Sequence, residues 1–346
     1  MTKRTIATAL AALATAAVIG AGTATPAAAF KACQVTDTGG VDDKGFNQTA
    51  WKGVQDAASQ MGIETKLLES KAETDYEPNI NAFLTEKCDI IITVGFLLGD
   101  ATKKAAEANP DTKFSIVDFA YDPVVPNILG QVFATDEAAF LAGYLAAGMS
   151  QSGVVGTFGG INIPPVTIFM DGFVRGVEHY NTAKGASVTV LGWDPEKKEG
   201  LFTNNFESLD DGRAFAKNLV DEGADIVMPV AGPVGLGSAA LAAELGADAL
   251  KIIGVDVDQA VTDPDNAGVY LTSVEKKMDA TVLEAIKEAE DGSFKGGVVV
   301  GTLASGGVAL APFHELDSAV PADLKAELEA IKKGIIDGSI NVKGGG

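Results

Sequence analysis

The sequence predicts an α/β protein whose strands form parallel sheets. Apolar runs of strand length alternate with amphipathic runs of helix length along most of the chain. The strand-like runs are apolar at almost every position, as expected for strands buried on both faces. The alternation is nearly continuous, which is typical of successive βα units.

The elements follow in order from the pattern. In the first half we expect strands at 31–38, 64–70, 88–95, 113–120 and 127–134, with helices at 46–60, 77–87 and 101–109. The second half repeats the scheme, with helices at 136–151, 166–181, 210–223 and 235–246 and strands at 152–160, 187–193, 224–232 and 250–257. A strand at 268–276, a helix at 278–291, a strand pair within 295–313 and a helix at 322–338 complete the chain.

Two successive sets of strands indicate two lobes rather than one sheet. The late elements are enough to complete both sheets, so we expect the chain to cross between the lobes more than once. A single closed (β/α)₈ barrel is the competing fold that the pattern alone allows.

Residues 1–29 read as a signal peptide. Lys3 and Arg4 precede an apolar segment at 6–19, and 27–29 supply the small residues for cleavage before Phe30. This segment is too short to span a bilayer. We therefore expect an exported, soluble mature protein, with a buried N-terminal helix as the alternative interpretation.

The formal net charge of −21 argues against nucleic acid and anionic membranes as partners. His179 and His314 are the only histidines, and they lie far apart in the sequence. We expect no metal site and no cofactor.

Cys33 and Cys88 are the only cysteines, and each opens a strand-like segment. The two segments are neighbours in a doubly wound sheet of order 2-1-3. An exported protein meets an oxidising compartment, so a disulfide is expected, worth roughly 4 kcal/mol for a loop of about 55 residues. Two free buried thiols are the alternative.

Candidate ligand contacts gather where strands end, because ligands of open α/β sheets bind at the carboxyl ends of the strands. The strand ends supply carboxylates, amides, glycine loops and rings, including Asp37, Phe46, Asn47, Gly95, Phe96, Asp118, Gly160, Pro165, Phe206, Gly232, Asp256 and Lys276. This set suits a neutral, polyhydroxylated and partly flat ligand such as a sugar or a nucleoside.

Each candidate also has a structural interpretation. Asp37 and Asp118 fit helix caps, Phe46 fits the core and Lys276 fits a solvated surface. Asp42 and Asp43 are expected to be structural. No nucleophile motif is recognisable, although paired carboxylates are the machinery of glycosidases.

The stretch DTGGVDDKGFN at 37–47, followed by Ala50-Trp51 and Gly53, resembles the signature of the basic membrane protein family. These are purine-nucleoside-receptor-like substrate-binding proteins of ABC importers. Further blocks resemble the family in the family's order over nearly the whole mature chain: ITVGFLLGDA, GGINIPPVTIFMDGF, EGADIVMPVAGPVGLG, IGVDVDQ, LTSVEKKMD and GGVALAPF.

The resemblance implies an α/β type I periplasmic-binding-protein fold, in which two Rossmann-like lobes with parallel-dominated sheets are joined by a three-stranded hinge. We expect the first lobe to comprise residues 30–133 and 257–294, and the second 134–256 and 295–346. The ligand cleft lies between them.

The resemblance also implies roles for the strand-end residues. Asp37, Asn47 and Asp118 hydrogen-bond the base. Phe46 and Phe206 stack on its two faces. Gly232, Asp256 and Lys276 contact the ribose. The implied protein is a monomer that delivers a nucleoside, expected to be a purine nucleoside, to an ABC permease and its ATPase.

Two alternatives remain open from the sequence. One is a receptor of the same fold for a sugar or another small polar solute. The other is a secreted enzyme such as a nucleoside hydrolase or glycosidase.

The chain departs from the family pattern at two places. Gly45 stands where the family usually has Ser before Phe-Asn. The residues before Cys33 form a poor lipobox, so we expect a periplasmic or secreted protein that is not lipidated.

Overall fold

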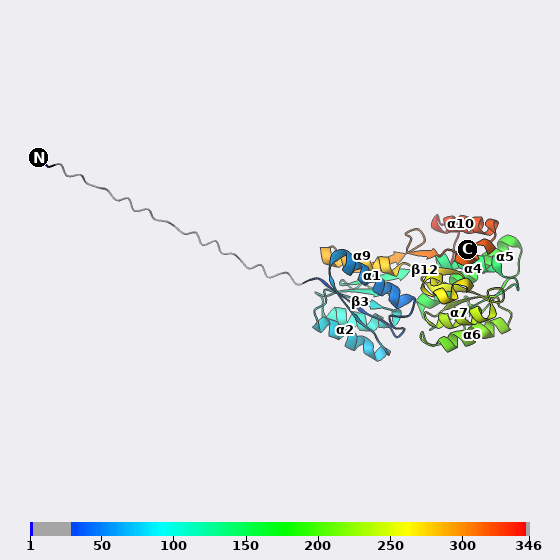
Figure 1. Cartoon of the computed structure of the whole chain (residues 1–346), viewed down its shortest axis with the longest axis horizontal. Helices are drawn as coiled ribbons and strands as arrows, with labels where there is room; N and C mark the ends of the chain where they lie inside the picture. Colours follow the sequence, from blue (N-terminus) through cyan, green and yellow to red (C-terminus); the bar gives the residue numbers. More distant parts are fainter. Residues whose placement is uncertain (3–28, 344–346) are drawn as a thin grey trace.

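The computed structural model describes residues 1–2 and 29–343, so the expected signal peptide lies almost wholly outside the described residues. Two lobes stand side by side in Figure 1. Within the described part of the chain, each lobe is built on one six-stranded, largely parallel sheet with helices on both faces. Two open sheets exclude the closed barrel and confirm the α/β class.

The first lobe has the strand order β13-β5-β4-β3-β1-β2. Helices α1 and α9 cover one face of this sheet, while α2 and α3 pack on the other. The elements are β1 (Lys31–Val35), α1 (Phe46–Met61), β2 (Glu64–Leu68), η1 (Glu73–Asp75), α2 (Tyr76–Thr85), β3 (Ile90–Val94), η2 (Phe96–Leu98), α3 (Gly99–Ala108), β4 (Lys113–Val117), β5 (Ile128–Phe133), α9 (Met278–Asp291) and β13 (Gly297–Gly301).

The second lobe has the order β14-β12-β11-β10-β6-β7, in which only β14 runs antiparallel to its neighbour among the described strands. Its elements are α4 (Thr135–Met149), β6 (Val154–Gly159), α5 (Pro164–Lys184), β7 (Thr189–Leu191), α6 (Leu209–Asp221), β10 (Ile226–Val230), α7 (Val234–Leu245), β11 (Lys251–Asp256), α8 (Gln259–Thr262), η3 (Pro264–Val269), β12 (Tyr270–Lys276), β14 (Val308–Leu310), η4 (His314–Ala319) and α10 (Ala322–Ile336), with a small ribbon of β8 (Trp193–Asp194) and β9 (Glu199–Gly200).

The two sheets share one topology. In each, the first strand of the lobe lies between the second and third, which gives the 2-1-3 order that the sequence predicts. β1 is therefore flanked by β2 and β3, as β6 is by β7 and β10. The crevice at this switch point is the usual ligand position in such sheets.

A disulfide joins Cys33 of β1 to Cys88, just before β3. The Cα atoms are 6.1 Å apart, within the usual range for a disulfide. The bond lies in the buried core on the α2 and α3 side of the first sheet. It ties two central strands whose carboxyl ends both reach the cleft.

The chain crosses between the sheets at 133–135, 276–278 and 301–308. Backbone hydrogen bonds connect these crossings: the Ala134 N–H donates to the Gly301 carbonyl at 2.8 Å, and the Lys277 N–H to the Gly307 carbonyl at 2.9 Å. Three adjacent crossings therefore form the hinge.

Two late strands differ from the expected division into lobes. β12, which we assigned to the first lobe within 257–294, pairs in the second sheet, and β13, assigned to the second lobe, pairs with β5 in the first. The two strands expected within 295–313 are present as β13 and β14, and they complete one sheet each. An apolar run indicates a strand but not which sheet the strand joins. The lobe boundaries remain our proposal, with these strands exchanged.

Helices α4 and α5 pack closely through glycines. A Cβ at Gly143 would lie 2.0 Å from the Phe173 carbonyl oxygen, and one at Gly176 would lie 2.0 Å from that of Phe140. A Cβ at Gly172 would lie 2.4 Å from the Asp136 carbonyl oxygen, so the start of α4, at the hinge, packs against the middle of α5.

Candidate functional site

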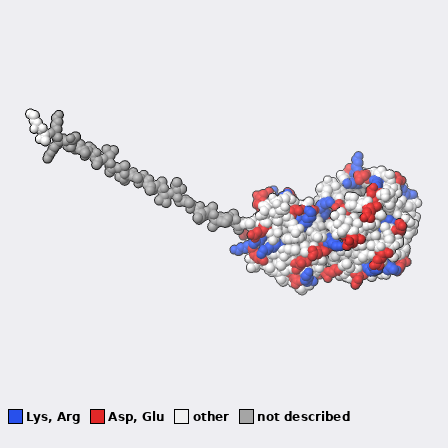
Figure 2. All heavy atoms as spheres, in the orientation of Figure 1, with Lys and Arg blue, Asp and Glu red and all other residues white. Residues whose placement is uncertain are grey.

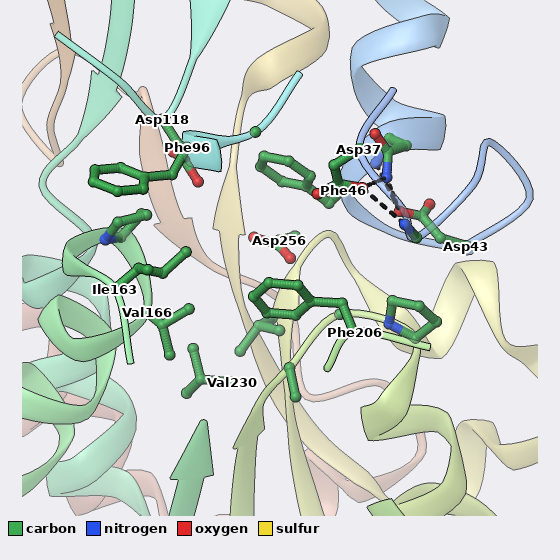
Figure 3. A pocket seen from close by; sticks show the side chains of 18 of the residues that line it. Asp37, Asp43, Phe46, Phe96, Asp118, Ile163, Val166, Phe206, Val230 and Asp256 are labelled. Carbon is green, nitrogen blue, oxygen red and sulfur yellow. Dashed lines mark hydrogen bonds between the residues drawn. The ribbon is translucent and has the colours of Figure 1, made fainter. Parts of the chain in front are cut away.

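A pocket lies between the lobes, where the carboxyl ends of both sheets meet (Figure 3). It comprises about 600 Å³ of space outside protein atoms, including space open to solvent. All eight predicted ligand residues line it: Asp37, Phe46, Asn47, Asp118, Phe206, Gly232, Asp256 and Lys276.

The loop between β1 and α1 holds the polar edge of the first lobe. Asn47 donates from Nδ2 to Asp37 Oδ1 at 2.7 Å and to Asp43 Oδ2 at 3.2 Å. Because both contacts are carboxylates, the amide nitrogen must face them. Asp43 also accepts the backbone N–H groups of Gly45, Asn47 and Gln48 at the start of α1. Asp43 lines the pocket, yet these bonds assign it the structural role that the sequence predicts.

Two oxygen acceptors remain available on this edge. Asn47 Oδ1 is buried without a hydrogen-bond partner among the described residues. Asp37 uses Oδ1 for the Asn47 amide and the Gly39 N–H, and its Oδ2 has no recorded donor within the described part of the chain. Burial raises the pKa of Asp37 to about 6, although the hydrogen bonds from Asn47 and Gly39 lower it. A ligand that presents N–H or O–H donors would satisfy both acceptors.

Lys276, at the end of β12, carries the buried charge of the pocket. Its Nζ lies 2.6 Å from Asp118 Oδ2 in the first lobe and 3.3 Å from Asp256 Oδ1 in the second. Burial lowers the pKa of Lys276, but the two carboxylates outweigh burial and raise it overall. Burial raises the pKa of Asp118, and Lys276 partly offsets this. The lysine thus stays charged and connects the lobes.

Asp118 and Asp256 occupy equivalent positions in the two lobes. Each stands at the end of the fourth strand of its sheet in the shared topology, β4 and β11. Both have left-handed backbones, with φ of 66° and 71°. Such conformations cost about 1–3 kcal/mol for residues other than glycine and cluster at functional sites. In this backbone conformation, both carboxylates contact Lys276.

Aromatic rings from both lobes face the pocket. Phe46, at the start of α1, and Phe206, in the loop before α6, project into the same space in Figure 3. Gly160 allows this placement of Phe206, because a Cβ there would lie 2.3 Å from the Phe206 ring. The Lys276 ammonium group lies 5.0 Å from the Phe46 ring centroid and 5.1 Å from that of Phe169. Cation–π attraction thus adds to the ion pairs of the lysine.

Gly232 follows β10 with φ of 54°, and a Cβ there would meet no atom within 4 Å. Its backbone therefore lines the pocket without a side chain between it and a ligand.

Sequence reasoning missed most of the apolar lining. Phe96 and Pro165 appeared only as strand-end residues, while several others gave no signal of their own. These missed residues are Leu97, Ile163, Val166, Phe169, Val230 and Val255. Apolar side chains at helix starts and strand ends look like core, and only the placement of the second lobe shows that they face a cleft.

In the part of the chain that the structure describes, no cluster of three or more His, Cys, Asp or Glu residues could hold a metal ion. Among the same residues, no helix has both the length and the hydropathy to cross a membrane.

The fold and pocket define a two-lobed solute-binding protein of the type I periplasmic-binding class. The chain belongs to the family described as ABC transporter substrate-binding protein PnrA-like, whose model matches residues 30–344. This confirms the resemblance to the basic membrane proteins. The role as a substrate-binding component of an ABC transporter follows from the family.

Two relatives are similar in sequence to this chain along most of their length. The ABC transporter nucleoside-binding protein BmpA of Lactococcus lactis subsp. cremoris is 31% identical over 329 residues, which cover 90% of this chain and 89% of the relative. Basic membrane protein A of Borreliella burgdorferi is 31% identical over 307 residues, covering 88% and 85%.

Solved structures confirm the fold. An ABC transporter solute-binding protein from Aeropyrum pernix K1 superposes with a TM-score of 0.81 at 26% identity, over 90% of this chain and 92% of that one. Another, from Conexibacter woesei, has a TM-score of 0.69 at 22% identity, over 90% and 98%, and supports the fold alone.

Proposed function

We propose that this protein binds a purine nucleoside between its lobes and delivers it to an ABC permease and its ATPase. One observation carries the proposal: Phe46 and Phe206, from opposite lobes, face the same space beside the free acceptors of Asp37 and Asn47. Two rings suit a flat base, and oxygen acceptors suit the N–H groups on its edge. The nucleoside-binding relative from Lactococcus lactis supports this choice.

The second lobe and the hinge provide a different chemistry. Asp256, Lys276 and the Gly232 backbone combine a carboxylate, an ammonium group and peptide groups along one side of the pocket. These groups accept from and donate to hydroxyls, so they suit a ribose. The proposed orientation places the base between the phenylalanines and the sugar beside the lysine.

Binding in this cleft couples to closure. The ligand touches both lobes only when they are together, so it stabilises the closed form and shifts the population toward it. Lys276 already joins the lobes through Asp118 and Asp256. The closed, loaded form is the one that we propose the permease recognises.

Calorimetric titration with adenosine, guanosine, inosine, cytidine and uridine tests the proposal. We expect purine nucleosides to bind with a Kd near or below about 1 μM and to leave the protein chemically unchanged on chromatography. Tighter binding of ribose or galactose would support the sugar receptor instead. Conversion of inosine to hypoxanthine and ribose would show an enzyme.

We also propose that the mature protein is a monomer that begins at Phe30 and carries no lipid, in the periplasm or secreted. The start at Phe30 and the absence of lipid rest on the leader pattern and the poor lipobox. Intact-mass measurement of protein recovered from the native host tests the cleavage site and the absence of lipid together. A mass that includes acyl chains, as in a lipoprotein, would overturn it.

A further inference from the structure

A second cavity adjoins the nucleoside pocket and is not needed to hold a base or a ribose. It comprises about 570 Å³ of space outside protein atoms, including space open to solvent. Its lining comes from both lobes: Phe96, Asp118, Phe119, Ala120, Val132, Phe133, Thr135, Pro164, Pro165, Ile168 and Lys276. Because Phe96, Asp118, Pro165 and Lys276 line both spaces, the two cavities are neighbours on either side of these residues.

The second cavity is largely apolar. Phe96 and Phe119 form an aromatic wall, with ring centroids 4.9 Å apart. Pro164, Pro165 and Ile168, from the start of α5, face it from the second lobe. A wall of rings and aliphatic side chains favours an apolar group.

One unpaired polar group also lies here. Thr135, the first residue of α4, is 1% exposed, and its Oγ1 has no hydrogen-bond partner among the described residues. Its side chain lines the cavity. A buried hydroxyl without a partner is unfavourable, so a ligand atom that donates to or accepts from it would be stabilising.

The charges around the cavity disfavour an anion. Lys276 is already paired with Asp118 and Asp256, so it offers no free positive charge. Asp118 is the carboxylate that lines the cavity. A phosphate would face this carboxylate without a counter-ion of its own.

We propose that this cavity is a second subsite, which receives an apolar substituent carried by the bound nucleoside. The inference rests on the proposed nucleoside function. It names the ligand class as nucleosides with an uncharged, largely apolar extension rather than nucleotides. A substituent would pass from the first pocket into the second cavity beside the four residues that line both, Phe96, Asp118, Pro165 and Lys276.

The first arm of the test compares ligands on the full mature protein by calorimetry. The probes are adenosine, 5′-deoxy-5′-methylthioadenosine, N6-benzyladenosine and adenosine 5′-monophosphate. We expect at least one apolar derivative to bind within about tenfold of adenosine or more tightly, and the monophosphate to bind more weakly than that derivative. If both apolar derivatives bind more weakly than this, or the monophosphate binds best, the subsite is wrong.

The second arm fills the cavity. Ile168→Trp and Ala120→Leu add volume to opposite walls, and Leu245→Trp adds the same indole at an exposed position on α7, outside both cavities. We expect each filling variant to weaken the accepted derivative about tenfold more than it weakens adenosine, while Leu245→Trp changes neither. Equal losses for both ligands would overturn the subsite. Two filling variants on different lobes guard against one that fails to fold, which circular dichroism would reveal.

The two arms separate the inference from the function beneath it. If adenosine and the other unmodified nucleosides bind but the derivatives do not, only the subsite fails. If no nucleoside binds the wild-type protein, the proposed function itself fails.

Discussion

At the scale of single residues, the site depends on side chains whose neighbours fix their orientation. The Asn47 amide is held between Asp37 and Asp43, which leaves its oxygen for a ligand. Gly160 leaves room for the Phe206 ring. Asp118 and Asp256 accept strained backbones and meet at Lys276. Several of the residues that we expect to touch the ligand therefore have a neighbour that fixes their position.

Replacing Phe206 by Ala removes one face of the proposed stack. We expect adenosine affinity to fall by about 1–3 kcal/mol, the usual loss for one base–aromatic stack, as measured by calorimetry. Phe294→Ala provides the matched control, because Phe294 packs against the core and does not line the pocket. A loss of similar size in both variants would contradict the stacking role.

The raised pKa of Asp37 predicts a pH dependence of binding. Burial raises the pKa to about 6, and the carboxylates of Asp256 and Asp118 add to it, while Asn47 and Gly39 oppose it. The ionised form accepts a ligand N–H. Protonation removes that acceptor, so affinity should fall as the pH drops through about 6, by up to about tenfold per unit below it.

Titration of adenosine binding between pH 5 and pH 8 measures this slope. Asp37→Asn removes the titrating group, so its weaker binding should be independent of pH over the same window. If the variant retains the slope, another group is responsible. Asp43, whose pKa burial raises to about 7, would be the first candidate.

At the scale of elements, the sequence predicts the order of strands and helices well and their assignment to sheets only in part. Strands read clearly because parallel strands buried on both faces are apolar throughout. The 2-1-3 order and the neighbouring positions of Cys33 and Cys88 follow from this. The exchange of β12 and β13 between lobes was not predictable, because an apolar run does not show which sheet a strand joins, or whether it lies inside the sheet, as β12 does, or at its edge, as β13 does.

The candidate site was also predictable from the sequence only in part. All eight predicted residues line one pocket because strand ends of both sheets converge there, and that convergence follows from the topology. Apolar residues such as Phe169 and Val166 were missed, since a ring or a branched side chain on a helix normally means core. Their exposure to the cleft depends on how the second lobe is placed, which no local pattern encodes.

The disulfide between β1 and the start of β3 makes a prediction at this scale. Replacing both Cys33 and Cys88 by Ala should lower the free energy of unfolding by roughly 4 kcal/mol, because the unfolded chain loses a loop constraint of about 55 residues. Urea denaturation of the oxidised protein and the double variant measures the difference. The reduced wild-type protein is the control and should unfold near the variant. Equal stability of the oxidised and reduced forms would contradict this contribution.

At the scale of the whole molecule, charge and shape fit a protein that works through its cleft. Acidic and basic side chains are interspersed over the face in Figure 2, so that face offers no broad basic surface for nucleic acid. The two sheets present equivalent strand ends to one another across three hinge crossings. The residues that line the pocket are thereby divided between the two lobes, as the proposed closure on binding requires.

An ion pair away from the ligand also joins the lobes. Lys44, in the loop before α1, donates from Nζ to Asp263 Oδ1 at 2.9 Å, and Thr262 donates from Oγ1 to the Lys44 carbonyl at 2.8 Å. Asp263 is 2% exposed and also accepts from Tyr270 and Asn266, so it stays in place without the lysine. These bonds form only when the first lobe meets the end of α8 and the residue that follows it, so they favour the closed form.

Replacing Lys44 by Ala should therefore open the cleft more often without altering the ligand contacts. We expect a Kd for adenosine about 2- to 10-fold higher, mostly through faster dissociation in stopped-flow measurements, with the ranking of bases unchanged. Lys71→Ala is the matched control, because Lys71 pairs with Glu69 inside the first lobe at 3.7 Å. An unchanged dissociation rate in Lys44→Ala, or an equal change in the control, would show that closure does not depend on this pair. A changed ranking of bases would instead place Lys44 in the binding site, where no pocket contact locates it.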